Sequence, residues 1–192
     1  QLIISEYNSK SLKAIDTVSK HVSTLYRDSS HGLQYLLQDS PTGNIYVTFN
    51  HGVGLYDYQR NTFSVFTGSS SSGFVDREFS QLRFNLPRGL ALLSHSTLLV
   101  ADQYNDRLRV LDLTANISSS ICSGIRGHSD GDVASCSLRN PWSLLKVNEI
   151  VYIGEEGFIR TIQGKNQFNT SLKMSDIKLD STYYTLSPTR KI

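Results

Sequence analysis

The sequence predicts an all-β fold, a small β-propeller of four four-stranded blades in which the C-terminal strand completes the N-terminal blade. Two observations carry this prediction. A segment of strand, turn and strand at residues 98–112 recurs in weaker form along the chain, and so do the linkers between its copies. The chain also begins at the second strand of a unit and ends on the pattern of a first strand. Repeats of about 40 to 55 residues are typical of propeller blades.

The clearest copy of the repeat lies at residues 98–112. Residues 98–101 form an apolar run, residues 102–106 are rich in turn formers, and residues 107–111 alternate polar and apolar side chains. A period of two is typical of a half-buried strand, so this pattern predicts a β-hairpin. Residues 117–121 predict a further strand after it.

Three weaker copies predict three more hairpins. Residues 4–16 align with residues 100–112 without a gap, and glycine shortens the turn in the copies at residues 44–58 and 149–162. The predicted outer strands of these units are residues 21–25, 62–66 and 167–172, and the predicted inner strands are residues 33–38, 88–93 and 142–147.

The linkers repeat with one constant offset. Gly73, Asp76 and Pro87 fall in register with Gly127, Asp130 and Pro141, and proline is tolerated at the first position of a strand because it has no N–H to donate. We therefore expect one domain over residues 1–192. Its blades are predicted at residues 181–192 with 1–28, then 29–68, 69–122 and 123–180. Pairing of the last strand with the first blade would close the ring and remove an open sheet edge.

The composition is that of a soluble globular domain. Of the 192 residues, 39% are hydrophobic and 19% are charged, and 19 basic against 17 acidic residues leave a formal charge of +2. Such a balanced charge does not indicate electrostatic binding of nucleic acid. The longest apolar stretch falls far short of the ~20 residues that cross a bilayer, so we expect no membrane insertion in this segment. The chain starts with Gln1, and we expect a processed product or an excised piece.

Two cysteines and two sequons favour an extracellular location, as a secreted protein or an ectodomain. Cys122 and Cys136 lie 14 positions apart across a turn-rich segment, which predicts a disulfide; two unrelated buried thiols are the alternative. Asn116 and Asn169 begin N-glycosylation acceptor patterns, which matter only in the secretory pathway.

The repeat resembles that of the NHL-repeat β-propellers, including extracellular members. That repeat runs from a Gly-rich linker with Asp-Gly through Pro and Gly-Leu-Ala to Val-Ala-Asp, Asn, Arg-Ile-Arg and Asp. The matching residues of this chain, all within residues 68–141, are Gly73, Asp76, Pro87-Arg88-Gly89-Leu90-Ala91, Val100-Ala101-Asp102, Asn105, Arg107-Leu108-Arg109 and Asp112.

The match is weaker over residues 1–67 and 142–192. In the other units Glu6, Phe49 and Glu155 stand in the place of Asp102. Most members of the family look six-bladed, whereas this length allows four blades. The resemblance therefore implies either a small ring or a portion of a larger one.

The pattern predicts no enzyme, no metal site and no cofactor. Catalysis needs a converging nucleophile, base and orienting group, and a metal needs ligands at recurring spacing. Neither pattern is visible, and residues 128–132 fit the family's linker better than a calcium loop. Some propellers similar to this family are metal-dependent lyases, which keeps a lyase or hydrolase as a distant alternative. The five histidines fall at different places in different units: His21, His31, His51, His95 and His128.

A cytoplasmic RNA-binding propeller is the nearer alternative, because some NHL propellers are similar to RNA-binding regulators. Its basic residues would be those that could line up on equivalent strands. They are Lys10, Lys13, Arg107, Arg109 and Arg160. The balanced charge, the sequons and the cysteine pair oppose this reading.

The leading prediction is a non-catalytic extracellular propeller that binds another protein, or a second copy of itself, through the loops of one rim. Tyr, Asn and Arg suit contact surfaces because they give area and hydrogen bonds with little loss of entropy. Asp16, Asp102 and Asp112 are expected to accept hydrogen bonds from turn amides, and Trp142 is expected in the core. The candidate binding residues, all on the equivalent hairpin turns, are Tyr7, Asn8, His51, Tyr104, Asn105, Arg107, Glu155 and Glu156.

Overall fold

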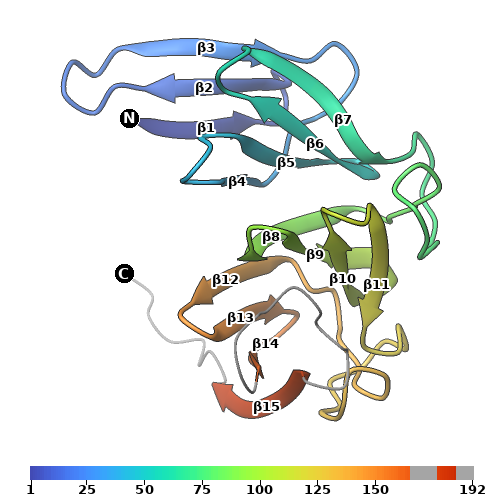
Figure 1. The fold of residues 1–192 in the computed structure, drawn as a ribbon. Coiled ribbons are helices and arrows are strands. Elements are labelled where there is room, and N and C mark those ends of the chain that lie inside the picture. Colours follow the sequence, from blue (N-terminus) through green and yellow to red (C-terminus); the bar gives the residue numbers. More distant parts are fainter. Residues whose placement is uncertain (165–176, 185–192) are drawn as a thin grey trace.

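The computed structural model describes residues 1–164 and 177–184, and these residues form four antiparallel sheets without an α-helix (Figure 1). The first sheet contains β1 (Leu2–Glu6), β2 (Ser11–Ile15) and β3 (Val22–Arg27). The second contains β4 (Leu36–Gln38), β5 (Ile45–Phe49), β6 (Gly52–Asp57) and β7 (Thr62–Gly68). The third contains β8 (Pro87–Ser94), β9 (Thr97–Asp102), β10 (Arg107–Asp112) and β11 (Ile117–Ile121), with a 3-10 turn at Gln103–Asn105. The fourth contains β12 (Ser143–Val147), β13 (Ile150–Glu155), β14 (Phe158–Gly164) and β15 (Ile177–Tyr184). No helix in the described part of the chain has the length and apolar character to span a membrane.

The repeated hairpins are confirmed, and their registers match. Val100 pairs with Arg109 between β9 and β10. The equivalent pairs are Ile4 with Lys13, Val47 with Gly54, and Ile153 with Arg160. Equivalent residues of the repeat are therefore paired across the hairpin in all four sheets.

Three apolar cores lie between consecutive sheets. Leu12 and Tyr56 belong to the core between the first and second sheets, and Phe84 to the core between the second and third. Within β9, Leu98 packs toward the second sheet whereas Leu99 packs toward the fourth. Both faces of the third sheet are thus covered, which explains why residues 98–101 form an unbroken apolar run rather than an alternating one.

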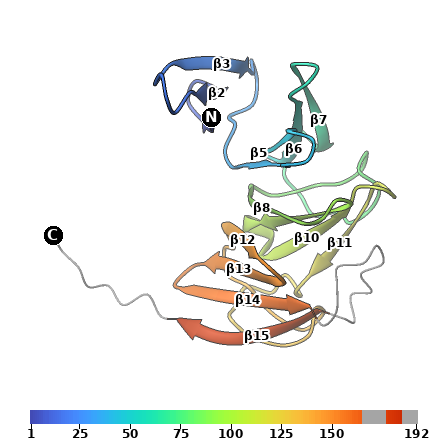
Figure 2. The ribbon, with the colours of Figure 1, turned by 60° about the vertical axis from the view of Figure 1, so that its left-hand side comes forward.

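The expected closure by the C-terminal strand is wrong for residues 181–184. They belong to β15, which pairs with β14 and forms the outer strand of the fourth sheet. Pairing with the strand that precedes it in the chain closes a much shorter loop than pairing with the first sheet, and so costs less entropy. The first and fourth sheets lie at opposite ends of the stack (Figure 2). Residues 167–172, predicted as that outer strand, and residues 185–192 lie outside the described residues.

The first sheet contains three strands in the described residues, with β1 at one edge. By its register, β1 corresponds to the second strand of the other sheets, as predicted. The innermost strands of those sheets lie side by side, with β8 next to both β4 and β12. The four sheets therefore follow one another around a common side, as consecutive blades do.

Candidate functional site

One end of the sheet stack gathers the loops that the sequence marks as candidates. We call it the rim face, and it comprises the turns between second and third strands together with the starts of β4, β8 and β12. Neighbouring sheets touch there. The Ser5 hydroxyl donates to the Gln34 carbonyl, the Arg88 guanidinium lies 5.9 Å from the centre of the Tyr35 ring, and the Gly89 N–H donates to the Trp142 carbonyl over 3.0 Å.

Four large aromatic side chains are exposed on the rim face, one or more at each junction of sheets. The exposed fractions are 55% for Tyr7, 39% for Tyr35, 52% for Tyr104 and 42% for Trp142. Tyrosine and tryptophan are typical anchors of protein interfaces because they bury a large area with few rotatable bonds. These side chains give the rim face its clearest chemical character.

Trp142 was predicted in the core, and that prediction is wrong. The structure explains its place through Gly154, the partner of Ser143 in β13. The indole Nε1 lies 3.1 Å from the position that a Cβ of Gly154 would take. Because glycine leaves this space open, the indole lies along β13 at the surface instead of inserting between sheets. Tyr7 lies in a similar way against Gly32, whose Cβ would meet the phenol ring.

Arg88 stands between these aromatic residues at the start of β8. Its Nε donates to Gln103 Oε1 over 2.9 Å, which fixes the guanidinium beside Tyr35. Sequence reasoning missed Tyr35, Arg88 and Trp142 as binding candidates. The signal was available, because Gln34, Arg88 and Trp142 occupy equivalent positions at the starts of the inner strands.

Several predicted rim residues instead hold the structure together. Glu155 is only 1% exposed and pairs with Arg160, so its carboxylate does not face a partner. Asn105 donates through Nδ2 to Asp102 and to the Gly73 carbonyl, both over 2.8 Å. Arg107 donates to the Ser123 carbonyl over 2.9 Å and lies 3.8 Å from the centre of the Phe74 ring.

The remaining predicted rim residues differ in exposure. Asn8 is exposed beside Tyr7, whereas His51 is half-buried and its Nδ1 has no hydrogen-bond partner within the described part of the chain. Glu156 is half-exposed and forms ion pairs with Arg126 and Arg139, whose nitrogen atoms both lie 3.1 Å from Glu156 Oε2. Although desolvation opposes the shift, these cations and an amide hydrogen bond lower the pKa of Glu156.

A buried acid–base cluster lies beneath the rim face in the third sheet. Arg109 is fully buried and pairs with Asp102 at 2.8 Å and with Asp76 of the preceding linker at 2.6 Å. It also donates to the carbonyls of Val75 and Arg83. The cluster ties the linker to the second and third strands.

Equivalent clusters occupy the first and fourth sheets. Arg160 pairs with Glu155 and with Asp130 of its linker, and Lys13 pairs with Glu6 at 2.7 Å. The second sheet has Phe49 and Gly54 at these positions, and the ring of Phe63 fills the space beside that glycine. Arg109 and Arg160 are therefore committed to internal ion pairs and are not presented to an RNA backbone.

The structure describes both cysteines and one of the two sequons. Cys122 and Cys136 form the predicted disulfide, with Cα atoms 4.6 Å apart. Asn116 is exposed in the turn before β11. Asn169 lies outside the described residues.

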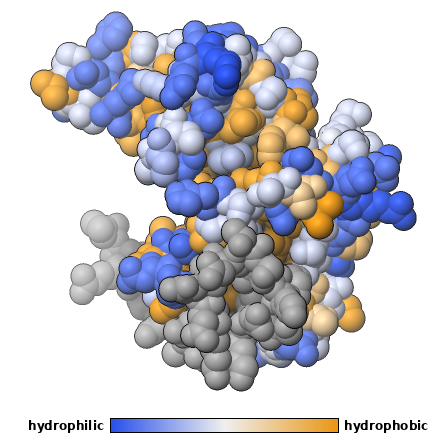
Figure 3. Space-filling view, in the orientation of Figure 1, coloured by the Kyte–Doolittle hydropathy of each residue, from blue (hydrophilic) through white to orange (hydrophobic). Residues whose placement is uncertain are grey.

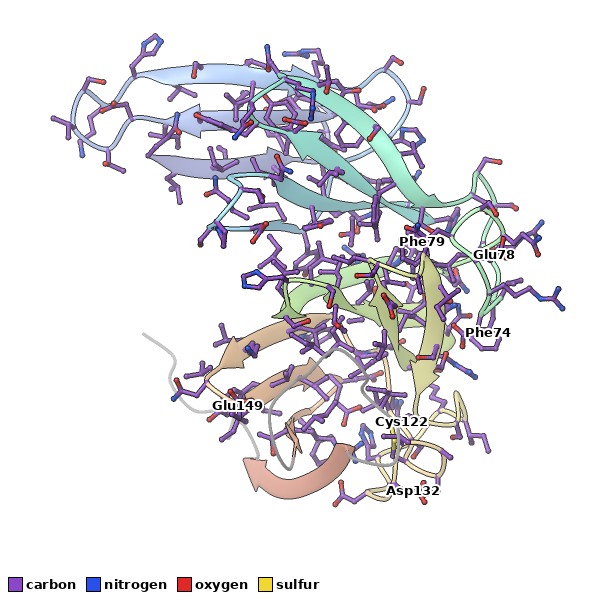
Figure 4. All side chains as sticks on the ribbon, viewed as in Figure 1. Phe74, Glu78, Phe79, Cys122, Asp132 and Glu149 are labelled. Atoms are coloured by element: carbon purple, nitrogen blue, oxygen red, sulfur yellow. A yellow bond between two sulfur atoms is a disulfide. The ribbon has the colours of Figure 1, made fainter. Side chains whose placement is uncertain are left out.

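A groove of about 670 Å³ opens at the end opposite the rim face, between the turns that follow β4, β8 and β12. Figure 3 shows the surface indented there, between the second sheet and the third and fourth sheets. Figure 4 places Glu149 at the turn between β12 and β13. Within the described residues no three or more His, Cys, Asp or Glu side chains converge as a metal site. The groove combines apolar and ionisable side chains, among them Leu37, Asp39, Leu92, His95, Leu145 and Glu149.

Neither a family model nor a curated protein matches this sequence. The fold, in contrast, is similar to solved structures. An auxiliary nutrient binding protein from Bacteroides thetaiotaomicron gives a TM-score of 0.67 at 16% identity, covering 80% of this chain and 42% of that chain. A chain of a nidogen/laminin complex gives 0.62 at 10% identity, covering 92% and 61%. Virginiamycin B lyase from Staphylococcus aureus gives 0.57 at 10% identity, covering 92% and 50%.

This chain therefore spans about half the length of the structures that it resembles. At such low identities the likeness concerns the fold alone. It supports a propeller-like arrangement of four antiparallel sheets.

Proposed function

We propose that this chain is a non-catalytic, extracellular recognition propeller of the NHL-repeat type that binds another protein through its rim face. The observation that carries the proposal is the set of exposed aromatic side chains at that end. Tyr7, Tyr35, Tyr104 and Trp142 come from different sheets and are each at least 39% exposed. Arg88 lies among them, and Trp, Tyr and Arg are the residues that dominate binding energy at protein interfaces.

The arrangement of charges agrees with recognition rather than with acid–base chemistry. Asp102, Glu155, Arg109 and Arg160 are all buried in mutual ion pairs. Their charges hold linkers to sheets, and the most exposed large side chains of the rim face are aromatic. Such a surface gives contact area and hydrogen bonds without a reacting group.

The extracellular part of the proposal draws on the disulfide and on the exposed Asn116 sequon. Disulfides persist in oxidising compartments. Among the similar structures, one is described as a nutrient binding protein and another as part of a nidogen/laminin complex. Those descriptions agree with a binding role.

A quantitative capture experiment tests the proposal. Wild-type protein and the Tyr104→Ala and Trp142→Ala variants are immobilised and exposed to extracellular fluid, and the bound proteins are measured by mass spectrometry. We expect at least one protein whose recovery falls about 30-fold in the rim variants, as for hot-spot residues worth about 2 kcal/mol. Tyr58→Ala is the matched control, because Tyr58 is also 39% exposed but lies on the outer hairpin after β6.

Two results would contradict the proposal. Equal recovery by the rim variants and by Tyr58→Ala would remove the rim face as the binding surface. Salt-sensitive capture of RNA, in place of protein, would favour the cytoplasmic RNA-binding alternative. Circular dichroism of each variant confirms that the sheets remain folded.

A further inference from the structure

The linker between β7 and β8 forms a second groove, and none of the exposed aromatic residues of the rim face lines it. Its volume is about 540 Å³, and Figure 4 shows Phe74, Glu78 and Phe79 along the same linker. Two of its lining residues are arginines. The lining consists of Ser69, Val75, Arg77, Ser80, Gln81, Leu82 and Arg83.

Arg77 and Arg83 are exposed cations without a carboxylate partner among the described residues. Two other exposed arginines do have a carboxylate partner, since Arg60 pairs with Asp57 and Arg126 with Glu156. An unpaired guanidinium keeps its full set of N–H donors available. It can form bidentate bonds with an oxyanion.

Asp76, the acidic residue directly before Arg77, is already neutralised. The Asp76 carboxylate turns toward the third sheet, where it accepts from Arg109 and from the hydroxyls of Ser118 and Ser120. Glu78 lies between the two arginines in the sequence, but it is not among the residues that line the groove. The groove lining therefore carries two cationic side chains and no acidic one, although the whole chain has a formal charge of only +2.

The groove is held in shape by the sheets on either side of it. Val75 and Arg83 form a β-bridge, and Ser118 of β11 donates its N–H to the Arg77 carbonyl over 3.0 Å. Thr67 of β7 donates its hydroxyl to the Phe79 carbonyl over 2.9 Å. A ligand would meet a preorganised surface and would lose less free energy in ordering it.

A glycine fixes the direction of one cation. The side chain of Arg83 lies along Gly73, where an added Cβ would be 3.0 Å from Arg83 Cδ. Near the two guanidinium groups, Ser80 and Gln81 add a hydroxyl and an amide to the lining. This donor set is complementary to tetrahedral oxyanions.

We propose that this groove binds the sulfate groups of an anionic glycan chain. Two guanidinium groups with neighbouring polar donors match sulfate oxygens, and an open groove at the surface admits a chain that continues past it. The disulfide and the exposed Asn116 favour an extracellular polyanion over a nucleic acid. The site is separate from the aromatic residues of the rim face, so either proposal can fail alone.

Heparin is the probe for the experiment, measured by affinity in about 50 mM salt and by the salt concentration that elutes the protein. We expect the Arg77→Ala/Arg83→Ala double variant to bind heparin at least about tenfold more weakly than wild type. Its affinity should also depend less steeply on salt concentration, because two contacts between guanidinium and sulfate groups are lost. Arg60→Ala is the matched control. It removes one cation whose side chain is 80% exposed and already paired, and we expect its elution to match wild type.

Three outcomes would overturn the proposal. The double variant could elute at the same salt concentration as wild type. The Arg60→Ala variant could lose as much heparin affinity per removed charge as the double variant does. Chemically desulfated heparin could bind as tightly as heparin. A single-stranded RNA of equal charge that binds more tightly than heparin would assign the groove to nucleic acid. Both arginines are exposed, so we expect the variants to melt as wild type does, and melting curves check this.

Discussion

A buried acid–base pair at one repeated position explains much of how each linker is held. In the third sheet Asp102 and Arg109 are both fully buried, and in the fourth sheet Glu155 and Arg160 are nearly so. Removing one partner of such a pair leaves an unpaired buried charge, which costs about 3–5 kcal/mol. The arginine of each pair also binds an aspartate of the preceding linker and so holds that linker against the sheet. This role accounts for charged residues on strands that are otherwise apolar.

The exposed version of the pair, Glu6 with Lys13, makes the first sheet sensitive to acid. The hydrogen bonds from Lys13 and Ser9 lower the pKa of Glu6 from 4.5 to about 2. Because the folded pKa is depressed, the stability that Glu6 contributes is present above pH 4.5 and is lost as the pH falls toward 2. We expect Glu6→Gln to be less stable than wild type near neutral pH.

Urea unfolding at about pH 7 and about pH 2.5 checks this prediction through the difference in free energy of unfolding between the two proteins. The difference should shrink in acid. A difference that stays the same at both values would show that the Glu6 carboxylate does not contribute through its charge. Asp57→Asn is a useful comparison, because its pKa is also lowered, by hydrogen bonds from Arg60.

The roles of single residues follow from the sequence only where they depend on local geometry. Asp112 was expected to accept from turn amides, and its Oδ1 accepts the N–H groups of Thr114 and Ala115, both over 2.9 Å. The burial of Glu155 and the exposure of Trp142 depend on residues of a neighbouring strand. Arg160 and Gly154 decide them, and alternation within one strand carries no information about either.

At the scale of elements, the linker before β12 depends on the disulfide. Cys122 ends the hydrogen-bonded run of β11 and donates its N–H to the Val133 carbonyl over 2.7 Å, while Ser123 donates to the Cys136 carbonyl over 2.8 Å. The bond closes a loop of 14 residues. By the chain-entropy relation such a loop contributes about 3 kcal/mol.

We expect Cys136→Ser to lower the melting temperature by about 6 to 12 °C without loss of β-sheet content, since about 1 kcal/mol shifts the melting temperature by 2 to 4 °C in a domain of this size. Differential scanning calorimetry under oxidising conditions measures the shift. The Cys122→Ser/Cys136→Ser double variant separates loss of the bond from the effect of a free thiol. Equal melting of wild type and double variant would contradict the prediction.

The strands themselves are largely predictable, because alternation and turn formers are local. The hairpins of all four sheets lie where the repeat places them. The last outer strand is different: β15 spans Ile177–Tyr184, and the predicted segment, residues 167–172, lies outside the described residues. Both segments favour β-structure by composition, so composition alone does not identify the strand that pairs with β14.

At the scale of the molecule, the sheets stack in chain order and leave β1 at the edge of the described structure. β5, β9 and β13 each pair on both sides, whereas β1 pairs only with β2 within residues 1–164 and 177–184. Repeats alone did not distinguish a ring that closes within this chain from consecutive blades of a larger ring. The echo of residues 40–42 at residues 187–189 suggested closure, but β15 is already committed to β14.

An open strand edge leaves alternate backbone amides without a partner, because in an antiparallel pair every second N–H points away from the neighbouring strand. In β5 the corresponding amides face β4 at residues 45–47. We therefore expect the outward-facing amides of β1 to exchange with solvent at least about 100-fold faster than those of β5, as is typical of amides outside a hydrogen-bonded ladder. Hydrogen exchange followed by NMR on dilute protein makes the comparison, with the inward-facing amides of β1 as the internal control. Equal protection on both sides of β1 would mean that another strand covers the edge. If that protection then grew with protein concentration, the strand would come from a second copy of the chain.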